Sequence, residues 1–385
     1  MHILLVGRGD IIHVQRFLQL ALEAGHQVTL VDQHDPKPGG AIGYAFVPYP
    51  SRPNVGPLSR FRHMNRLTLR WTRRRLKMIW KKVCPDVVHV QYVDYRAFDC
   101  AKAGLHPLVL TLMGVEISRA LVDSTDKDLR MAYIETLRRA NYITADVQVE
   151  LDYCQRLAGE ILETGLFFYG IDLAKFKPDA QAGAALRAQL GFKSETKIVL
   201  SIRRLEPTLG QENILTAFAH AVEGLDFDAS LVFLRHHSFI TPPRYEQSLL
   251  ELAQQLGIGH RVRWFDGVAN AQMPALYNMA DVVVNFPDLD GLPVSLLEAA
   301  ACKRPTITCA LPVYREFLAA SAFLAVAPGD TSALGKTLRQ VLKGQLPNLQ
   351  TQLEKNHRLI AERYEQKVCF EKMEKIYQQV ARTEV

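Results

Sequence analysis

Short apolar runs alternate with amphipathic helical stretches along most of the chain, and this alternation restricts the possible folds more than any other feature. In the first half, strands are expected at 2–7, 27–32, 86–90, 107–113, 142–145 and 166–169, and a helix at about 13–24. In the second half, strands are expected at 197–202, 230–234, 261–265, 282–286 and 306–309, and helices at about 211–222, 245–256, 293–302 and 331–343. Apolar strands separated by helices are typical of parallel sheets that are covered on both faces.

The pattern occurs twice, and the 385 residues are more than one such domain needs. Strand patterning is replaced by Pro, Ala and Lys around 172–195, where we expect the seam. We therefore predict Rossmann-like, doubly wound α/β domains at 1–178 and 179–362, and a last helix at 363–385 that packs back on the first domain. Ligands of such folds bind at the carboxyl ends of the strands, so a cleft between the domains is expected. The Pro- and Gly-rich residues 33–57 are expected to form a long loop.

Composition excludes several other classes of protein. Apolar residues make up 48% and charged residues 22% of the chain, as in ordinary globular proteins. No apolar run is long enough to span a bilayer, and the first residues resemble a buried strand rather than a signal peptide. The six cysteines are scattered without a Cys-x-x-Cys pair, which favours reduced thiols of a cytoplasmic protein.

Positive charge is concentrated in one stretch, residues 60–82, which holds ten Lys or Arg and no acidic residue. Outside it, acidic residues outnumber basic ones. Leu69, Leu76, Ile79, Trp80 and Val83 fall at helical spacing in and just after the stretch, with Trp71 at the edge of the stripe. A basic amphipathic helix of this kind suits the surface of an anionic membrane. The alternative is a solvated helix whose apolar side packs on its own domain; nucleic acid is not expected, because no recognition motif accompanies the charge.

The turn after the first strand only partly matches a dinucleotide-binding fingerprint. Gly7 and Gly9 are present, but Ile12 stands at the third glycine position, so a dehydrogenase is disfavoured. The Gly9 turn still allows a ligand to approach the backbone and the start of a helix. His13, in the first helical turn, is either a hydrogen-bonding group for a substrate or a structural residue.

The most informative segment is 285–300, which follows a strand and opens a helix. Pro293 suits the first helical position, and Gly291 allows backbone amides to face a ligand. Asp290 lies in the loop and Glu298 about two turns further along, so both carboxylates are expected at the same cleft. Carboxylates placed in this way can accept hydrogen bonds from the hydroxyls of a ribose or a sugar.

Asp290-x7-Glu298, within Asp-Gly-Leu-Pro-x-Ser-Leu-Leu-Glu-Ala, resembles the Glu-x7-Glu signature of family 4 retaining glycosyltransferases, which have the GT-B fold. Four other segments and the last helix resemble further elements of that family, in the same order. They are 85–90, 169–178, 261–268, 280–284 and the helix at about 364–377. The resemblance covers essentially the whole chain. It implies a GT-B fold, with acceptor binding in the first domain and nucleotide-sugar binding in the second.

The resemblance implies roles for individual positions. Glu298 corresponds to the carboxylate that holds the donor ribose, and Asp290 to the one that contacts the transferred sugar. The remaining donor-binding positions are of three kinds. Gly291 and Leu292 correspond to backbone contacts around the sugar and diphosphate, and Pro293 to the start of the helix that binds phosphate. Gly267 and Val268 belong to the element near the nucleobase.

The phosphate-binding arginine is left open by the resemblance. Alignment through Leu205 favours Arg204, and a related subgroup pattern favours Arg203. In the first domain, Thr111–Glu116 resembles a loop that commonly contains His and Asp. Glu116 and His13 are therefore candidates to orient the donor sugar or the acceptor.

Three positions depart from the family pattern. Asp290 is one methylene shorter than Glu, Leu209 stands where a phosphate-binding Lys is usual, and Met113 replaces the common His. Loss of a charge-assisted contact typically removes about 1.5–3 kcal/mol. These departures motivate an alternative, a non-catalytic nucleotide-sugar-binding scaffold of the same fold.

The resemblance implies a retaining transferase that moves a sugar from a nucleotide sugar, expected to be a UDP-sugar, to a glycan or lipid-linked glycan. The leaving phosphate accepts the proton of the acceptor, so no protein nucleophile is needed. No cluster of metal-ligand spacing is found in the sequence, and no cofactor or metal is expected. We expect a cytoplasmic protein. If the basic helix at 60–82 binds anionic lipid, it attaches the protein peripherally to the inner face of the membrane. A sugar-nucleotide epimerase of similar fold fits the Asp-x7-Glu context less well.

Overall fold

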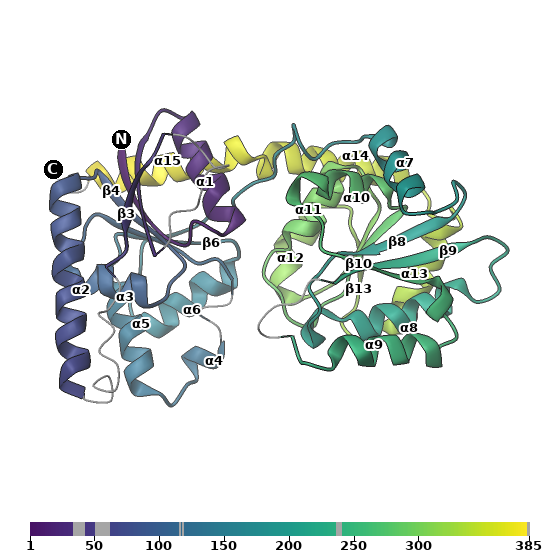
Figure 1. Ribbon diagram of the computed structural model, residues 1–385, viewed down its shortest axis with the longest axis horizontal. Coiled ribbons are helices and arrows are strands. Elements are labelled where there is room, and N and C mark those ends of the chain that lie inside the picture. The colour runs from purple at the N-terminus through teal and green to yellow at the C-terminus, as the bar shows by residue number, and fades with distance from the viewer. Residues whose placement is uncertain (34–42, 51–61, 115–116, 118, 236–240, 383–385) are drawn as a thin grey trace. The chain divides into compact units, whose positions relative to one another are not determined.

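A computed structural model describes residues 1–33, 43–50, 62–114, 117, 119–235 and 241–382. The chain divides into two compact units (Figure 1). Unit 1 comprises Met1–Gly170 and Gln366–Val385, and unit 2 comprises Ile171–Glu365. These divisions differ from the expected boundaries at 178/179 and 362/363. The chain leaves unit 1 at Gly170, which has φ +79°, and returns to it at Gln366. A Cβ at position 170 would lie 2.2 Å from the Cα of Gln366, so the backbone approaches too closely there for any residue but glycine.

Unit 1 is built on a parallel seven-stranded sheet of order β3-β2-β1-β4-β5-β6-β7. Its strands are β1 (His2–Val6), β2 (Gln27–Asp32), β3 (Ala45–Pro48), β4 (Val87–Gln91), β5 (Leu108–Thr111), β6 (Tyr142–Ala145) and β7 (Thr164–Leu166). Its helices are α1 (Ile12–Glu23), α2 (Arg62–Val83), α3 (Tyr95–Ala103), α4 (Arg119–Val122), α5 (Lys127–Arg139), α6 (Gln148–Ala158) and α15 (Gln366–Arg382).

Alternate residues of the central strands of unit 1 enter two separate cores, as expected for a sheet covered on both faces. Ile3 and Leu5 pack with Phe17 of α1 and with Phe370 of α15. Leu4 and Val6 face the opposite core, which contains apolar residues of α2, α3, α5 and α6. The last helix therefore packs on the sheet of unit 1.

A buried polar network fixes α15 to this sheet. The Tyr377 hydroxyl lies 2.6 Å from His89 Nδ1, and His89 Nε2 lies 2.6 Å from Thr111 Oγ1. Thr111 Oγ1 is in turn 2.7 Å from Thr144 Oγ1. Burial lowers the pKa of His89 to about 3, so the ring is neutral at physiological pH.

Unit 2 is built on a second parallel sheet, of order β10-β9-β8-β11-β12-β13. Its strands are β8 (Lys197–Ser201), β9 (Ala229–Arg235), β10 (Val262–Asp266), β11 (Val282–Asn285), β12 (Thr306–Cys309) and β13 (Leu324–Val326). Its helices are α7 (Ala180–Gln189), α8 (Gln211–Val222), α9 (Tyr245–Gln255), α10 (Met273–Met279), α11 (Val294–Ala301), α12 (Arg315–Ala320), α13 (Thr331–Leu342) and α14 (Leu349–Leu359). Short turns of helix are η2 (Pro207–Leu209), η3 (Gly259–Arg261), η4 (Asn270–Gln272), η5 (Pro312–Tyr314) and η6 (Ile360–Tyr364).

The strand order reverses between β1 and β4 in unit 1 and between β8 and β11 in unit 2. In each sheet, this reversal separates the loops that follow the two central strands, and ligands of doubly wound folds bind there. The α/β class and the two Rossmann-like units predicted from the sequence are confirmed.

Three strands differ from the sequence-based expectation. β3 lies within the expected loop 33–57, and β13 was not expected; both are short strands at a sheet edge. A strand was expected at 166–169, but β7 ends at Leu166. The Phe167 amide still donates to the Ala145 carbonyl of β6 at 2.8 Å, and the side chains of Phe167 and Tyr169 pack in the core that contains α1 and α15.

Two further findings concern the chain as a whole. All six cysteines are free thiols, and of these Cys84 alone is exposed. In the described ranges, no helix combines the length and apolar character that crossing a bilayer requires.

Candidate functional site

The candidate site of unit 2 lies where the strand order reverses, at the carboxyl ends of β8 and β11. β8 leads into Arg203 and Arg204, and β11 leads through a loop into α11. Pro293 caps α11 with an extended backbone (φ −78°, ψ 110°), so the helix begins at Val294, one residue later than expected. The short loop brings Asp290 and Gly291 to the amino end of this helix.

Asp290 is held by four hydrogen bonds. Arg203 donates two, from Nη1 to Oδ2 and from Nη2 to Oδ1, both at 2.8 Å. The Tyr314 hydroxyl donates to Oδ2 at 2.7 Å, and the Gly291 amide donates to Oδ1 at 3.1 Å. Burial, followed by the charge of Asp290, raises the pKa of Tyr314, so its hydroxyl stays protonated and donates.

Glu298 lies on α11 and is 7% exposed. Its Oε2 accepts a hydrogen bond of 2.8 Å from the hydroxyl of Tyr277 on α10. Burial, and then the Glu298 carboxylate, raises the pKa of Tyr277 well above its ordinary value, whereas the nearby Arg203 guanidinium lowers it. Arg203 therefore lies within electrostatic range of Tyr277, and both carboxylates belong to one charged cluster.

The two adjacent arginines have different environments. The Arg203 side chain is 16% exposed and is paired with Asp290. The Arg204 side chain is 43% exposed, and its Nε donates to Glu206 Oε2 at 2.7 Å. The structure thus brings Arg203, and not Arg204, into contact with the predicted Asp290.

Leu209, which replaces the usual lysine, is 2% exposed and lies in the apolar core of unit 2. The next residue, Gly210, has φ +75°, and a Cβ there would lie 1.9 Å from the carbonyl oxygen of Phe286. Only glycine allows the turn before α8 to approach the loop after β11 this closely. Position 209 therefore contributes no charge to this edge of the sheet, and the close turn depends on the glycine at 210.

Several polar side chains at this edge of the sheet were not identified from the sequence. Asn285 is 1% exposed and Thr308, its partner in the β11–β12 register, is fully buried. Neither the Asn285 amide nor the Thr308 hydroxyl has a hydrogen-bond partner among the described residues, and the same holds for Ser295 Oγ on α11. Buried polar atoms of this kind are normally satisfied by water or a ligand. Tyr277 and Tyr314 were also missed, because only the fold brings them to the carboxylates.

The remaining predicted donor positions also lie at the carboxyl edge of the unit 2 sheet. Gly267 and Val268 follow β10, with Gly267 exposed and Val268 half-buried. Leu292 is 8% exposed and precedes the Pro293 cap. In the described part of the chain, no group of three or more His, Cys, Asp or Glu side chains is placed to hold a metal ion.

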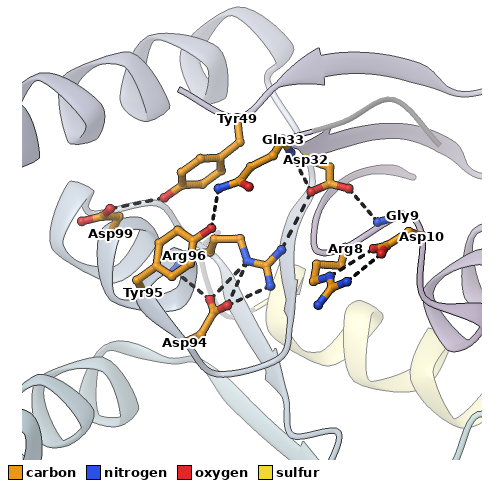
Figure 2. Close-up of polar contacts among 10 residues, drawn as sticks. All are labelled: Arg8, Gly9, Asp10, Asp32, Gln33, Tyr49, Asp94, Tyr95, Arg96 and Asp99. Carbon is orange, nitrogen blue, oxygen red and sulfur yellow. Dashed lines mark hydrogen bonds and ion pairs between the residues drawn. The ribbon is translucent and has the colours of Figure 1, made fainter. Parts of the chain in front are cut away.

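In unit 1, Gly9 and His13 lie at the equivalent edge, after β1 and in the first turn of α1. The Gly9 amide donates to Asp32 Oδ2 at 2.8 Å (Figure 2). His13 Nδ1 is buried without a partner within the described residues, and its ring lies 5.2 Å from that of Tyr169. Burial lowers the pKa of His13 to about 4, so the ring is neutral at pH 7. Glu116 lies outside the described residues.

Figure 2 also shows a charged network around Gly9 that was not expected from the sequence. Arg96, whose side chain is 3% exposed, donates to Asp94 Oδ2 at 2.8 Å and lies 3.9 Å from Asp32. Asp99 accepts hydrogen bonds from Tyr49 (3.3 Å) and from Arg73 of α2 (3.1 Å). This network fixes the loops after β2 and β4.

Comparison with known proteins places this geometry in a family. Residues 2–147 match the family described as Glycosyl transferase 4-like, and residues 184–360 match the one described as Glycosyl transferases group 1. A GDP-mannose-dependent alpha-(1-6)-phosphatidylinositol monomannoside mannosyltransferase of Mycobacterium tuberculosis is 31% identical over 146 residues, 36% of each chain. A D-inositol 3-phosphate glycosyltransferase of Corynebacterium glutamicum is 26% identical over 268 residues, 66% of this chain and 61% of that one. The match to the mycobacterial relative thus spans about a third of its length.

Solved structures share the fold across nearly the whole chain. Sucrose-phosphate synthase from Thermosynechococcus elongatus has a TM-score of 0.75 at 20% identity, covering 98% of both chains. Anabaena Alr3699/HepE in complex with UDP and glucose has a TM-score of 0.74 at 17% identity, covering 98% of this chain and 100% of that one. The family matches in both units show that the chain belongs to the family 4 glycosyltransferases, and the likeness to solved structures shows the GT-B fold.

Proposed function

We propose that this protein is a retaining glycosyltransferase that moves a sugar from a UDP-sugar to a glycan or lipid-linked glycan. The observation that carries the proposal is the cluster at α11, in which Arg203, Asp290 and Glu298 are held by Tyr314 and Tyr277. A cation and the amino end of a helix can bind a diphosphate, and a carboxylate such as that of Glu298 can accept hydrogen bonds from sugar hydroxyls.

In the proposed reaction, the departing diphosphate is the group that most needs stabilisation. Arg203 and the backbone amides at the start of α11 take up its negative charge. Tyr277 orients the Glu298 carboxylate, which accepts hydrogen bonds from the ribose hydroxyls. The leaving phosphate oxygen accepts the proton of the acceptor hydroxyl on the same face of the sugar, so the configuration is retained without a protein nucleophile. The reaction is proposed to need no metal ion.

Relatives with different donors make the choice of nucleotide a question for experiment. HepE was solved with UDP and with UDP-glucose, whereas the name of the mycobacterial relative specifies GDP-mannose. Calorimetric titration of the full chain with UDP, GDP and ADP tests the proposal directly. Preferential binding of UDP supports it, and preferential binding of GDP would replace UDP as the donor base. Release of nucleotide from the matching sugar nucleotide separates an enzyme from the non-catalytic scaffold, which binds without turnover.

We further propose that α2 brings the enzyme to an anionic membrane that carries its acceptor. The apolar stripe expected from the sequence packs inward: Leu76 is 1% exposed, and Ile79, Trp80 and Val83 lie against the core of unit 1. The opposite side of α2 carries a second apolar set, Leu67, Trp71 and Met78, which are 56%, 40% and 60% exposed.

Exposed basic residues flank this second set. Arg70, Arg74 and Lys77 are exposed, and the Arg75 guanidinium lies over the Trp71 ring at 5.3 Å. Arg73 points elsewhere and pairs with Asp99, so it belongs to the structure of unit 1. Exposed apolar side chains between cations suit a surface of anionic lipid headgroups.

Sedimentation with vesicles of phosphatidylserine and phosphatidylcholine tests this surface. Replacing Trp71, Arg70 and Arg74 with Ser is expected to lower the bound fraction several-fold at low salt. As a charge-matched control, Lys336→Ser with Lys343→Ser removes two exposed cations of unit 2, one on α13 and one directly after it. Equal binding by wild type and the α2 variant would contradict the membrane proposal while leaving the transferase proposal intact.

A further inference from the structure

Resting on the proposed donor site, we infer that Asp290 does not hold the transferred sugar but acts as a positioning residue. Together with Tyr314, it fixes the Arg203 guanidinium as the cation that binds the donor diphosphate. The family resemblance implied a different role, direct contact between this carboxylate and the sugar.

The hydrogen-bonding capacity of Asp290 is already used within unit 2. A carboxylate has about four acceptor positions, two on each oxygen. Oδ1 accepts from Arg203 Nη2 and from the Gly291 amide, and Oδ2 accepts from Arg203 Nη1 and the Tyr314 hydroxyl. A sugar hydroxyl would have to displace one of these donors, two of which belong to a bidentate ion pair.

Arg203, by contrast, keeps unused donors. A guanidinium has five N–H groups, and the pair with Asp290 uses two of them. Asp290 is the one hydrogen-bond acceptor of this side chain within the described ranges, and the side chain is 16% exposed. Its remaining N–H groups, including that of Nε, can therefore form a second bidentate contact with a phosphate.

Position 209 explains why the chain needs such a cation. Leu209 is 2% exposed in the core and offers no charge where a lysine is usual. Arg204 is paired with Glu206 and is largely solvated. Arg203 is fixed by Asp290, and a guanidinium fixed in advance loses less side-chain entropy when a diphosphate binds.

The two roles of Asp290 predict different ligand dependence. If Asp290 positions Arg203, Asp290→Asn removes the ion pair and weakens binding of UDP and of UDP-glucose by the same factor. If Asp290 touches the sugar, the same substitution weakens UDP-glucose and leaves UDP unchanged. The ratio of the two affinities therefore separates the roles, and it does not change if the variant merely reduces the folded fraction.

Calorimetry on the full chain is the experiment, with UDP and UDP-glucose as probes. We expect Asp290→Asn to weaken both ligands about tenfold and Tyr314→Phe to weaken both about threefold, with the affinity ratio within twofold of wild type. Tyr245→Phe is the matched control, because it removes another tyrosine hydroxyl bond of unit 2, to Gln211 at 3.1 Å. The control is expected to bind both ligands as wild type does.

The Arg203→Lys background adds a second, independent readout. Lysine keeps the charge but cannot make the bidentate pair, so Tyr314→Phe is expected to have little further effect on UDP affinity there. Unchanged UDP affinity in Asp290→Asn, or a selective tenfold loss of UDP-glucose affinity, would overturn the inference. A wild-type chain that binds neither UDP nor UDP-glucose would instead refute the proposed UDP donor site on which the inference rests.

Discussion

The two units have the same kind of sheet, with a reversal of strand order at its centre, but they place charge at that edge in different ways. In unit 1, Arg8 pairs with Asp10 and Arg96 with Asp94, in each case two positions away, and Arg96 also lies 3.9 Å from Asp32 (Figure 2). In unit 2, Arg203 pairs with Asp290, 87 residues later.

The local ion pairs of unit 1 shape loops, whereas the long-range pair of unit 2 prepares an arginine for a ligand. A pair between near neighbours forms as soon as its loop folds, and it leaves little charge available to a ligand. The Arg203–Asp290 pair forms only when β8 and β11 are neighbours in the sheet, and it leaves donors of Arg203 unused at the start of a helix. We therefore expect substitutions in the unit 1 network to affect stability and those in the unit 2 cluster to affect nucleotide binding.

The largest effect is expected for Arg96→Leu in unit 1. The substitution leaves Asp94 and Asp32, whose side chains are 21% and 7% exposed, without their cation. Loss of one partner of a buried pair typically costs about 3–5 kcal/mol. Chemical denaturation measures the loss, and titration with UDP is expected to give wild-type affinity for the fraction that remains folded. A specific loss of UDP affinity would contradict the expectation that the charged network of unit 1 affects stability and not nucleotide binding.

Glu298→Gln is expected to have the next largest effect, this time on catalysis. The amide keeps the shape of the side chain but loses the charge that accepts from ribose hydroxyls. We expect kcat/KM for the donor to fall about 100-fold, or about 2.7 kcal/mol. Steady-state transfer assays test this, and the unfolding midpoint should stay close to that of wild type. A variant with full activity would remove Glu298 from the donor site.

Comparison of the adjacent arginines sharpens the contrast further. Arg203→Lys should weaken UDP binding about tenfold, about 1.4 kcal/mol, because the fork geometry is lost. Arg204→Lys should change it less than twofold, since that side chain pairs with Glu206 outside the cluster. Calorimetry on the two variants distinguishes the arginines, and the reverse order would assign the diphosphate to Arg204.

The smallest effect for a single residue concerns acid sensitivity in unit 1. Burial lowers the pKa of His13 to about 4 and that of His89 to about 3, both below the ordinary value of 6.5. The unfolded chain therefore binds more protons below pH 6.5, and stability is lost as the pH falls toward the folded-state pKa values. Between pH 6.5 and 5.5 the loss is about 1 kcal/mol for each histidine.

Hydrogen exchange at these two pH values, corrected for intrinsic rates, measures this loss. Protection of β4 should fall, with β11 of unit 2 as the internal reference. Replacing His89 by Asn should reduce the pH-dependent fall in the protection of β4. A fall in β11 that equals the fall in β4 would place the acid-sensitive groups elsewhere.

Local sequence patterns were sufficient for the regular elements. The expected segments 27–32, 142–145 and 306–309 coincide with β2, β6 and β12, and the expected helix 211–222 coincides with α8. Periodicity of apolar residues and flanking turn residues determine such elements, and both are visible in a short window of sequence. The expected strand at 166–169 extends beyond β7 because Tyr169 is buried by helix packing, which a strand pattern cannot distinguish from sheet pairing.

The sequence by itself determined the two α/β units, the carboxylates at positions 290 and 298 around one helix start, and the concentration of charge in α2. Each of these depends on residues that are close together in the chain. Only the tertiary structure decided which arginine meets Asp290, that Tyr277 and Tyr314 hold the carboxylates, and which side of α2 is exposed. These contacts join residues that are distant in sequence, and they form only after the sheets and their covering helices have packed.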